Sequence, residues 1–266
     1  MNFKTLTLVA LALLWGCTPL AKRQASRVAP ESTDYNAFVL RAVATMPAGG
    51  GYSTRPDAAR ALQEAMTLRD GGIEVRTQPI PSFCSGATYL VFLKALALAK
   101  ENQAPWKREV LEALLVKGQD DGTGVWGRWN ANGPGTARLF FELGLGRNFS
   151  DWSQAKPGDF MKIFWNPHIG SKESGHSVVY LGTKDVEGTT YVGIWSSNTS
   201  NPDGTSGMGV KWYPRSQIHR ALFSRLENLE PMSKVLQLPV TDHYLADMLR
   251  RASSVEEMER KVGLTP

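Results

Sequence analysis

The feature that most constrains how this chain folds is the stretch at residues 84–100, CSGATYLVFLKALALAK, where apolar side chains occupy nearly every helical position. Its only charged residues are Lys94 and Lys100. A helix that is apolar on all sides is stable in water only when other elements cover it. The sequence therefore predicts a central, buried helix, with Ser82 as a candidate N-cap and Cys84 in the first turn.

A cysteine at the start of this helix has two interpretations. The free N–H groups and the dipole at a helix N-terminus favour an anion, which lowers the pKa of a thiol placed there. A structural role is the alternative, because free cysteine also packs as a small apolar residue. The choice between them depends on whether the fold brings a base to the thiol of Cys84.

The first half of the chain is expected to be helical around this segment. Pro56 suits the first turn of a helix, and the residues after it are amphipathic. Glycine-rich stretches at 49–51 and 118–135 predict loops, the second of which carries Trp126 and Trp129. We expect helices at residues 35–45, 56–68, 84–100, 106–116 and 136–143.

The second half contains apolar runs typical of β-strands, with turn residues between them. From Thr241 onward the tail is expected to be helical, with Ser254 and Glu257 as a capping box. Helices followed by antiparallel strands indicate an α+β fold, in which the buried helix packs on a sheet. The expected strands are residues 159–165, 176–182, 191–197 and 209–214.

The composition is that of a globular protein with one main domain, since 42% of the 266 residues are apolar and 21% are charged. Despite a formal net charge of +5, no run of lysine and arginine is long enough for a nucleic-acid groove. No cluster of histidine, cysteine or carboxylate has metal-ligand spacing, and no glycine-rich loop follows a strand to hold phosphate. We expect a monomer without metal, cofactor or nucleic-acid partner.

Residues 1–16 have the pattern of a secretory signal, in which Lys4 is followed by an apolar stretch that ends at Gly16. This stretch is shorter than the roughly 20 residues of a membrane-spanning helix. The motif LWGC resembles the lipobox of bacterial lipoproteins, which implies that Cys17 is lipidated, although Trp15 replaces the usual small residue. A secretory signal cleaved nearby and an uncleaved anchor are the alternatives.

The polar, aperiodic residues 17–33 are expected to form a tether between this anchor and the folded body. The lipobox resemblance implies an exported protein of the bacterial cell envelope, lipid-anchored on the periplasmic side of a membrane. It also leaves Cys84 without a disulfide partner. An unpaired thiol in an oxidising compartment is a liability unless it is buried or used.

A nucleophilic cysteine needs a base within hydrogen-bond reach and a third group to orient that base. Of the four histidines, His176 is the best candidate, because it opens an apolar strand directly after the loop SKESG. In the next strand, alternation places Ser196 and Asn198 on one face. Asn198 is the first candidate for the third group, because its amide can accept the imidazole N–H, and Ser196 is the second. A plain polar loop is the alternative for this segment.

Two segments, FCSGATYLVF and KPGDFMKIFW…SGHSVVYLG, resemble the NlpC-like cell-wall cysteine peptidases in order and spacing. Related amidases of the CHAP type share this layout. The resemblance covers residues 75–226 and implies a papain-like catalytic domain at 75–230, between an N-terminal helical region at 34–74 and a C-terminal helical tail at 231–266. The matching residues are Cys84, Ser85, Gly86, Pro157, Gly158, Asp159, Gly175 and His176.

The chain departs from that family at Phe83, where the family usually has an aspartate that helps to bind the free amine of a stem peptide. Phe83 cannot form this contact, so the cleaved bond is open between a stem peptide bond and the sugar–peptide amide. The hairpin before the third catalytic residue is also lengthened by TKDVEGTT. Candidate substrate-binding residues are Phe83, Ser85, Trp126 and Trp129, although the two tryptophans can instead clamp their loop onto the core.

Together these observations predict a cysteine hydrolase that cleaves amide bonds in peptidoglycan peptides, as an endopeptidase or an amidase. Cys84 is the expected nucleophile, His176 the general base and acid, and Asn198 or Ser196 the orienting group. An acyltransferase that uses the same cysteine and histidine is one alternative. A non-catalytic envelope lipoprotein that binds glycan or a protein partner is the other.

Overall fold

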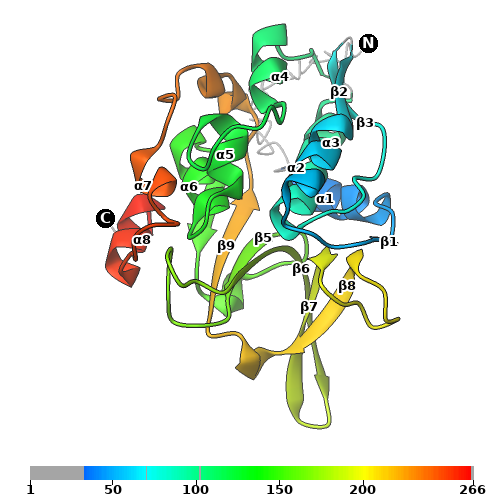
Figure 1. The fold of residues 1–266 in the computed structure, drawn as a ribbon, viewed down its shortest axis with the longest axis vertical. Coiled ribbons are helices and arrows are strands. Elements are labelled where there is room, and N and C mark those ends of the chain that lie inside the picture. Colours follow the sequence, from blue (N-terminus) through cyan, green and yellow to red (C-terminus); the bar gives the residue numbers. More distant parts are fainter. Residues whose placement is uncertain (1–32, 70, 102, 265–266) are drawn as a thin grey trace, which may run out of the picture. The chain divides into compact units, whose positions relative to one another are not determined.

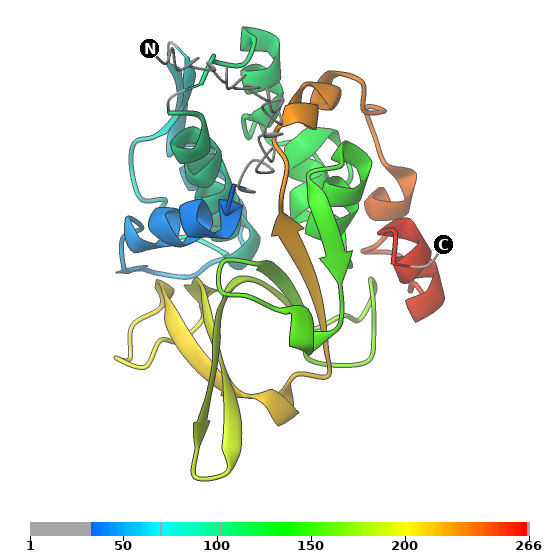
Figure 2. The ribbon, with the colours of Figure 1, turned by 180° about the vertical axis from the view of Figure 1, so that it is seen from behind.

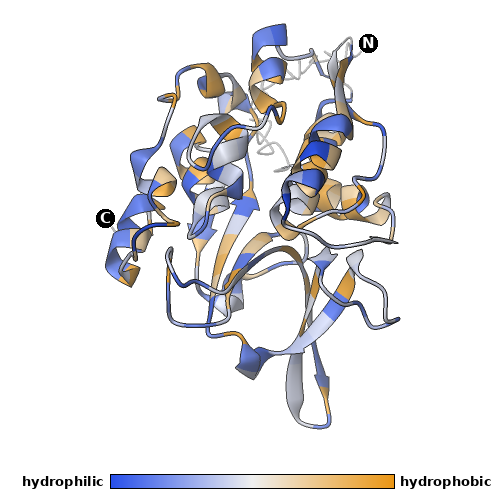
Figure 3. Cartoon of the chain, viewed as in Figure 1, coloured by the Kyte–Doolittle hydropathy of each residue, from blue (hydrophilic) through white to orange (hydrophobic). Residues whose placement is uncertain are grey.

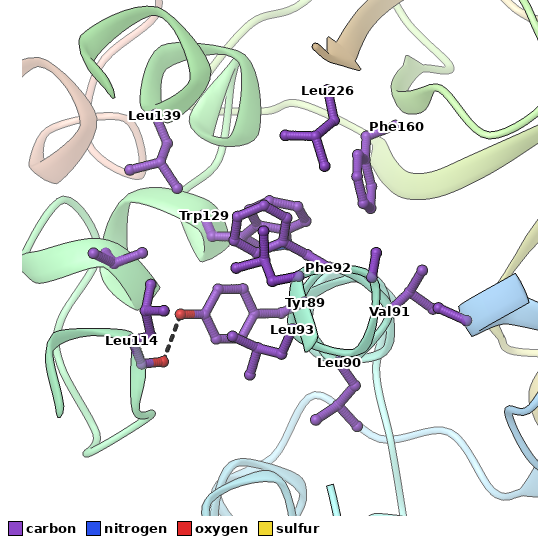
Figure 4. Packing of buried hydrophobic residues seen from close by; sticks show 14 of the residues in the cluster. Tyr89, Leu90, Val91, Phe92, Leu93, Leu114, Trp129, Leu139, Phe160 and Leu226 are labelled. Atoms are coloured by element: carbon purple, nitrogen blue, oxygen red, sulfur yellow. Dashed lines mark hydrogen bonds between the residues drawn. The ribbon is translucent and has the colours of Figure 1, made fainter. Parts of the chain in front are cut away.

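The central helix of the fold is α3 (Cys84–Lys100), as its apolar sequence predicts. Figure 4 looks along this helix and shows side chains that leave it in several directions. The Tyr89 hydroxyl donates a hydrogen bond of 2.6 Å to the carbonyl of Leu114. The Phe92 ring stacks on Trp129, with ring centroids 4.9 Å apart. Contacts around the circumference explain why the helix can be apolar on nearly every face.

The structure is a computed structural model that describes residues 33–69, 71–101 and 103–264. The expected secretory signal, Cys17 and the tether as far as residue 32 lie outside the described residues. The described residues belong to one compact unit, which includes the N-terminal helical region and the C-terminal tail. In these three described ranges, no helix is long and apolar enough to cross a membrane.

A seven-stranded sheet packs against α3, and all its neighbouring strands are antiparallel. The strands are β1 Gly49–Gly50, β2 Met66–Arg69, β3 Gly72–Val75, β4 Gly146–Phe149, β5 Phe160–Phe164, β6 Gly175–Val186, β7 Thr189–Asn198, β8 Gly207–Pro214 and β9 Arg220–Leu226. The sheet order is β1-β8-β7-β6-β5-β9-β4, while β2 and β3 form a separate hairpin. Figure 1 shows the long β6–β7 hairpin extending below the other strands.

Successive side chains of these strands point to opposite faces of the sheet. Phe160 and Val179 belong to the same apolar core as α3. Their neighbours Met161 and Val178 belong to a second core on the other face of the sheet. The sheet is therefore buried on both faces along its central strands, and the fold is α+β, as the sequence predicts.

Helices flank α3 on both sides, with α1 and α2 on one side and α5 and α6 on the other (Figures 1 and 2). The α-helices are α1 Tyr35–Ala44, α2 Pro56–Glu64, α4 Arg108–Leu114, α5 Gly124–Asn130, α6 Gly135–Leu143, α7 His243–Ala246 and α8 Val255–Lys261. Short 3₁₀ helices occupy η1 Trp152–Gln154, η2 Arg215–Gln217 and η3 Glu230–Leu236.

The Pro-Gly-Asp segment before β5 joins α1 to the sheet. Asp159 is fully buried, and the guanidinium of Arg225 on β9 donates to both of its carboxylate oxygens, at 2.8 and 2.7 Å. The side-chain amide of Asn36 on α1 donates to Asp159 and to the carbonyl of Pro157, at 2.9 and 3.0 Å. Gly158 has a φ of 95°, and a Cβ there would lie 2.7 Å from the carbonyl oxygen of Asn36. Asp159 and Gly158 are thus used in the architecture.

The C-terminal tail packs on α6. Arg138 of α6 donates to the Asp242 carboxylate at 2.7 Å and to the carbonyl of Lys261 at 2.8 Å. The predicted helix start at Ser254 is confirmed, since its hydroxyl accepts the N–H of Glu257 at 3.1 Å. The expected capping box is only half formed, because the Glu257 carboxylate accepts from Arg251 and Ser253. Figure 3 shows α8 as mostly hydrophilic, which is expected of a helix that covers the protein with one narrow face.

Several expected boundaries were wrong. The helix expected to reach residue 68 ends at Glu64, because Met66–Arg69 pairs with β3 as a hairpin. The helix expected at 106–116 is shorter, and the glycine-rich loop at 118–135 contains α5. Strands β1, β4 and β9 have no counterpart in the sequence prediction.

Ser82 does not cap α3. Phe83 occupies the N-cap position, and the Ser82 hydroxyl bonds instead with the hydroxyl of Ser197 on β7, at 2.8 Å. This contact fastens the chain just before α3 to the sheet, so it helps to place the first turn of the helix against the strands.

Candidate active site

Cys84 is the first residue of α3 and lines a cavity of about 480 Å³. Phe83, at the N-cap, has extended backbone and no side-chain oxygen to offer the N–H groups of the first turn. Uncapped N–H groups at a helix start can stabilise negative charge on a thiolate or on a carbonyl oxygen bound beside it. The local structure therefore favours an ionised thiol.

His176, near the start of β6, and Asn198, the last residue of β7, form a buried pair in which His176 Nε2 lies 3.1 Å from Asn198 Oδ1. The Nδ2 group of this asparagine donates to the carbonyls of Ser196 and Gly209 and to Oδ1 of Asn201, at 3.0–3.2 Å. Because acceptors surround Nδ2, the amide must present its oxygen to the imidazole. Nε2 therefore carries a proton, and Nδ1 is left to exchange a proton with the thiol.

The electrostatics of the site favour the thiolate of Cys84. Burial on its own raises the pKa of this thiol, but the hydrogen bond and charge of His176 lower it, together with the Ser177 N–H and the Lys162 ammonium. The net effect lowers the pKa from its ordinary 9.0 to about 7. A large share of a thiol with this pKa is ionised at neutral pH, and the thiolate is the nucleophilic form.

Tyr52 is a candidate residue that the sequence analysis missed. It pairs with Ser82 in a parallel bridge, which brings it beside the start of α3. Burial raises the pKa of the phenol to about 12, and the charge and hydrogen bond of the Cys84 thiol act in the same direction. Tyr52 is therefore a protonated donor at neutral pH. A tyrosine after three glycines carries no periodic signal, and only the pairing with Ser82 brings it to the site.

Polar side chains form one wall of the cavity. The Ser85 hydroxyl donates to Oδ1 of Asn130 at 2.7 Å, and Nδ2 of Asn130 donates to the Asp121 carboxylate at 2.9 Å. Burial raises the pKa of the Asp121 carboxyl group. Ser85, an expected substrate-binding residue, thus lines the cavity with its hydroxyl held by Asn130.

An ion pair holds the loop before His176. Lys162 of β5 lies 2.5 Å from the Glu173 carboxylate, whose other oxygen accepts the N–H groups of Gly133 and Gly170 at 2.8 and 2.9 Å. A Cβ on Gly175 would approach the ends of the Glu173 and Lys162 side chains to 2.5 and 2.7 Å, so a larger residue there would displace this ion pair. The carboxylate of Glu173 is engaged on both oxygens and anchors this loop.

Of three other expected site residues, Ser196 lies away from the imidazole, and Phe83 and Trp126 line the cavity. The Ser196 hydroxyl donates to the carbonyl of Ser177 at 2.7 Å, so Ser196 fastens β7 to β6 and Asn198 is the residue at the imidazole. Phe83 and Trp126 line the cavity, with their rings edge to face and centroids 6.1 Å apart.

The expectation that Trp129 contacts substrate was wrong. Its side chain is 1% exposed and lies in the core beside α3. The indole N–H donates to the Ser85 carbonyl at 3.2 Å and to the Thr88 hydroxyl at 3.3 Å. Trp129 therefore supports the first turns of α3 from behind. The histidines that were not chosen, His168, His219 and His243, are exposed and do not line the cavity.

The described residues define an α+β protein in which a cysteine at the start of α3, a histidine near the start of β6 and an asparagine at the end of β7 lie together. Within the part of the chain that the structure describes, no group of three or more histidine, cysteine or carboxylate side chains could hold a metal ion. No protein-family model, curated protein or solved structure matches the chain. The resemblance to cell-wall peptidases accordingly rests on the motifs alone.

Proposed function

We propose that this protein is a cysteine hydrolase of amide bonds, with a papain-like arrangement of its central helix and sheet. The observation that carries the proposal is the buried His176–Asn198 pair together with a Cys84 thiol whose pKa is lowered to about 7. A structural cysteine needs neither an oriented imidazole nor a low pKa. A nucleophile needs both.

The reaction begins when the thiol proton of Cys84 passes to Nδ1 of His176. The thiolate attacks the amide carbonyl carbon, and a C–S bond forms. The C–N bond then breaks, and the imidazolium gives its proton to the leaving amine. His176 next takes a proton from water, whose oxygen attacks the thioester. The C–S bond breaks, the carboxylic acid leaves, and the imidazolium returns its proton to the sulfur.

Two kinds of donor support the oxyanion of the tetrahedral intermediate. The backbone N–H groups at the start of α3 are free of side-chain caps. The Tyr52 phenol lies close enough to feel the charge of the Cys84 thiol, and it remains protonated because burial raises its pKa to about 12. Fixed donors of this kind stabilise charge that develops in the transition state. Asn198 contributes differently, by fixing the proton on Nε2 so that Nδ1 faces the reaction.

Peptidoglycan peptides are the proposed substrate class, as the motif resemblance implies. The cavity beside Cys84 supports a charged peptide ligand, since Arg55 and Asp121 line it alongside the Lys162–Glu173 ion pair. Stem peptides carry both carboxylates and amines. We also propose that the protein is exported and lipid-anchored in the bacterial envelope, through the signal and lipobox pattern that ends at Cys17.

The test is incubation of the full chain with purified peptidoglycan, followed by mass analysis of the released products. Wild-type protein should release fragments that each contain one added water per bond cut. Cys84→Ala and His176→Ala should each abolish release, and the double variant should lose little more than either single one, because the two residues act as a unit. The matched control His219→Ala changes an exposed histidine and should keep full activity.

Release of fragments by a folded Cys84→Ala protein would contradict the proposed nucleophile. Products that carry an amine in place of water would show acyl transfer on the same site. Unchanged thermal unfolding of each variant confirms that a loss of activity is not a loss of fold.

A further inference from the structure

The site continues past His176 into a second hollow of about 240 Å³. Tyr52 and Gly175 line both this hollow and the cavity beside Cys84, so the two are neighbours. The lining of the second hollow includes no lysine, arginine, aspartate or glutamate. The first cavity has four such residues. One side of the reacting groups is thus charged, and the other is not.

Aromatic rings and small polar groups form the uncharged hollow. Trp165 follows β5 and Tyr213 lies in β8, and their ring centroids are 4.9 Å apart at an interplanar angle of 53°. Both side chains are partly exposed. Around them lie the exposed polar residues Ser174, Thr199 and Gln217. Their hydroxyl and amide groups can donate and accept hydrogen bonds, but they carry no charge.

We propose that this hollow is a sugar subsite that binds an uncharged pyranose ring of the glycan. The inference rests on the proposed function, and it names the substrate as peptide still attached to glycan rather than free peptide. A pyranose presents an apolar C–H face, which an aromatic ring can cover, and a rim of hydroxyl groups, which hydroxyl and amide side chains can bond. A charged ligand would find no lysine, arginine, aspartate or glutamate to pair with among the residues that line this hollow.

The departure at Phe83 agrees with this assignment. A carboxylate before the nucleophile would favour a free substrate amine, and Phe83 provides none. The Glu173 carboxylate does not replace it, because Lys162 and two backbone N–H groups already engage it. Neither Phe83 nor Glu173 therefore requires a free peptide amine, which agrees with a stem that is still joined to its sugar.

Trp165 also has a second task that must be separated from sugar binding. Its ring lies 6.5 Å from the His176 imidazole at an interplanar angle of 30°, so it shields the base. Tyr213 contacts Trp165 and lines the hollow. Lys211 lies over the Tyr213 ring at 5.0 Å, and its ammonium group donates to Ser200. Because Trp165 also shields His176, sugar binding is best tested at Tyr213.

The experiment measures binding of chitotetraose, an uncharged sugar chain without peptide, to the full-length Cys84→Ala protein by titration calorimetry. This protein should bind the sugar, and adding Tyr213→Ala should weaken binding about three- to tenfold. Adding Tyr213→Phe, which keeps the ring, should restore most of the affinity. The matched control is Trp212→Ala, which removes the neighbouring aromatic ring of the same strand. Trp212 does not line the hollow and packs on Gly193, so the control should bind as before.

No binding of chitotetraose to the Cys84→Ala protein would overturn the inference, as would equal losses in Tyr213→Ala and Trp212→Ala. If Tyr213→Ala does not fold, Trp165→Ala serves in the same assay, since binding to an inactive protein does not depend on the base. The readout is independent of catalysis. Sugar binding without hydrolysis of peptidoglycan by the wild type would refute the proposed hydrolase but not the sugar subsite. Hydrolysis without sugar binding would refute the sugar subsite but not the hydrolase.

Discussion

The sharpest prediction concerns alkylation of Cys84 by iodoacetamide in wild-type protein and in His176→Ala. Burial alone raises the pKa of this thiol, and His176 is the main group that lowers it to about 7. Removing the imidazole should return the pKa to its ordinary 9.0 or above, since the burial remains. At pH 6 the thiolate fraction then falls from about 9% to about 0.1%, which is a roughly 90-fold loss of the reactive form.

The rate falls less than this, because a more basic thiolate is a stronger nucleophile. The pKa of the variant thiol is about two units higher, and a Brønsted coefficient of about 0.4–0.5 makes its thiolate roughly six- to tenfold more reactive. His176→Ala should therefore react about tenfold more slowly than wild type at pH 6. At pH 10 both thiols are mostly ionised, and the variant should react roughly six- to ninefold faster. The two rate profiles should cross near pH 8.

The assay follows alkylation by mass spectrometry of the peptide that contains Cys84, from pH 5 to pH 10, with His219→Ala as the control that should follow the wild-type curve. A variant profile that coincides with the wild-type profile would show that the imidazole does not set the thiol pKa. Slower reaction of the variant at every pH would show that the substitution closed the cavity instead.

Two further predictions concern stability and location. Asp159→Ala leaves the Arg225 guanidinium buried without its counter-charge and should lower the free energy of unfolding by about 3–5 kcal/mol in urea titrations. The control Asp203→Ala, in an exposed loop, should leave the urea midpoint unchanged. Similar midpoints for the two variants would contradict the architectural role of the buried pair. Cys17→Ser should abolish uptake of radioactive fatty acid and release the protein from membranes or leave it unprocessed, and unlabelled, soluble wild-type protein would refute the lipobox interpretation.

The elements that were predicted well are those whose signal is local. The helix at 84–100 is apolar on nearly every face, so both the helix and its burial were predicted correctly. The start of α8 at Ser254 depends on a hydroxyl and an N–H three residues apart. Patterns of this kind lie within one continuous stretch of sequence.

The elements that were missed owe their conformation to distant partners. α5 lies in a glycine-rich stretch that reads as a loop, but Gly127 is needed because a Cβ would lie 2.0 Å from the carbonyl oxygen of Asp120. β9 carries Arg225 one residue before its end, and this charged residue weakens the strand pattern. Its buried partner, Asp159, is remote in sequence. A sequence pattern does not reveal such partners.

For the candidate site, the sequence by itself determined the chemical types: a cysteine at a helix start, a histidine at a strand start and two polar residues on the strand that follows. Alternation places Ser196 and Asn198 on the same face, so it does not choose between them. The register between β6 and β7 decided that Asn198 contacts His176, while the Ser196 hydroxyl donates to the Ser177 carbonyl. Tertiary structure alone also brought Tyr52 to the thiol and buried Trp129 behind α3. The reason is physical, because residue type sets what a side chain can do, whereas hydrogen-bond reach of about 3 Å is set by how remote segments pack.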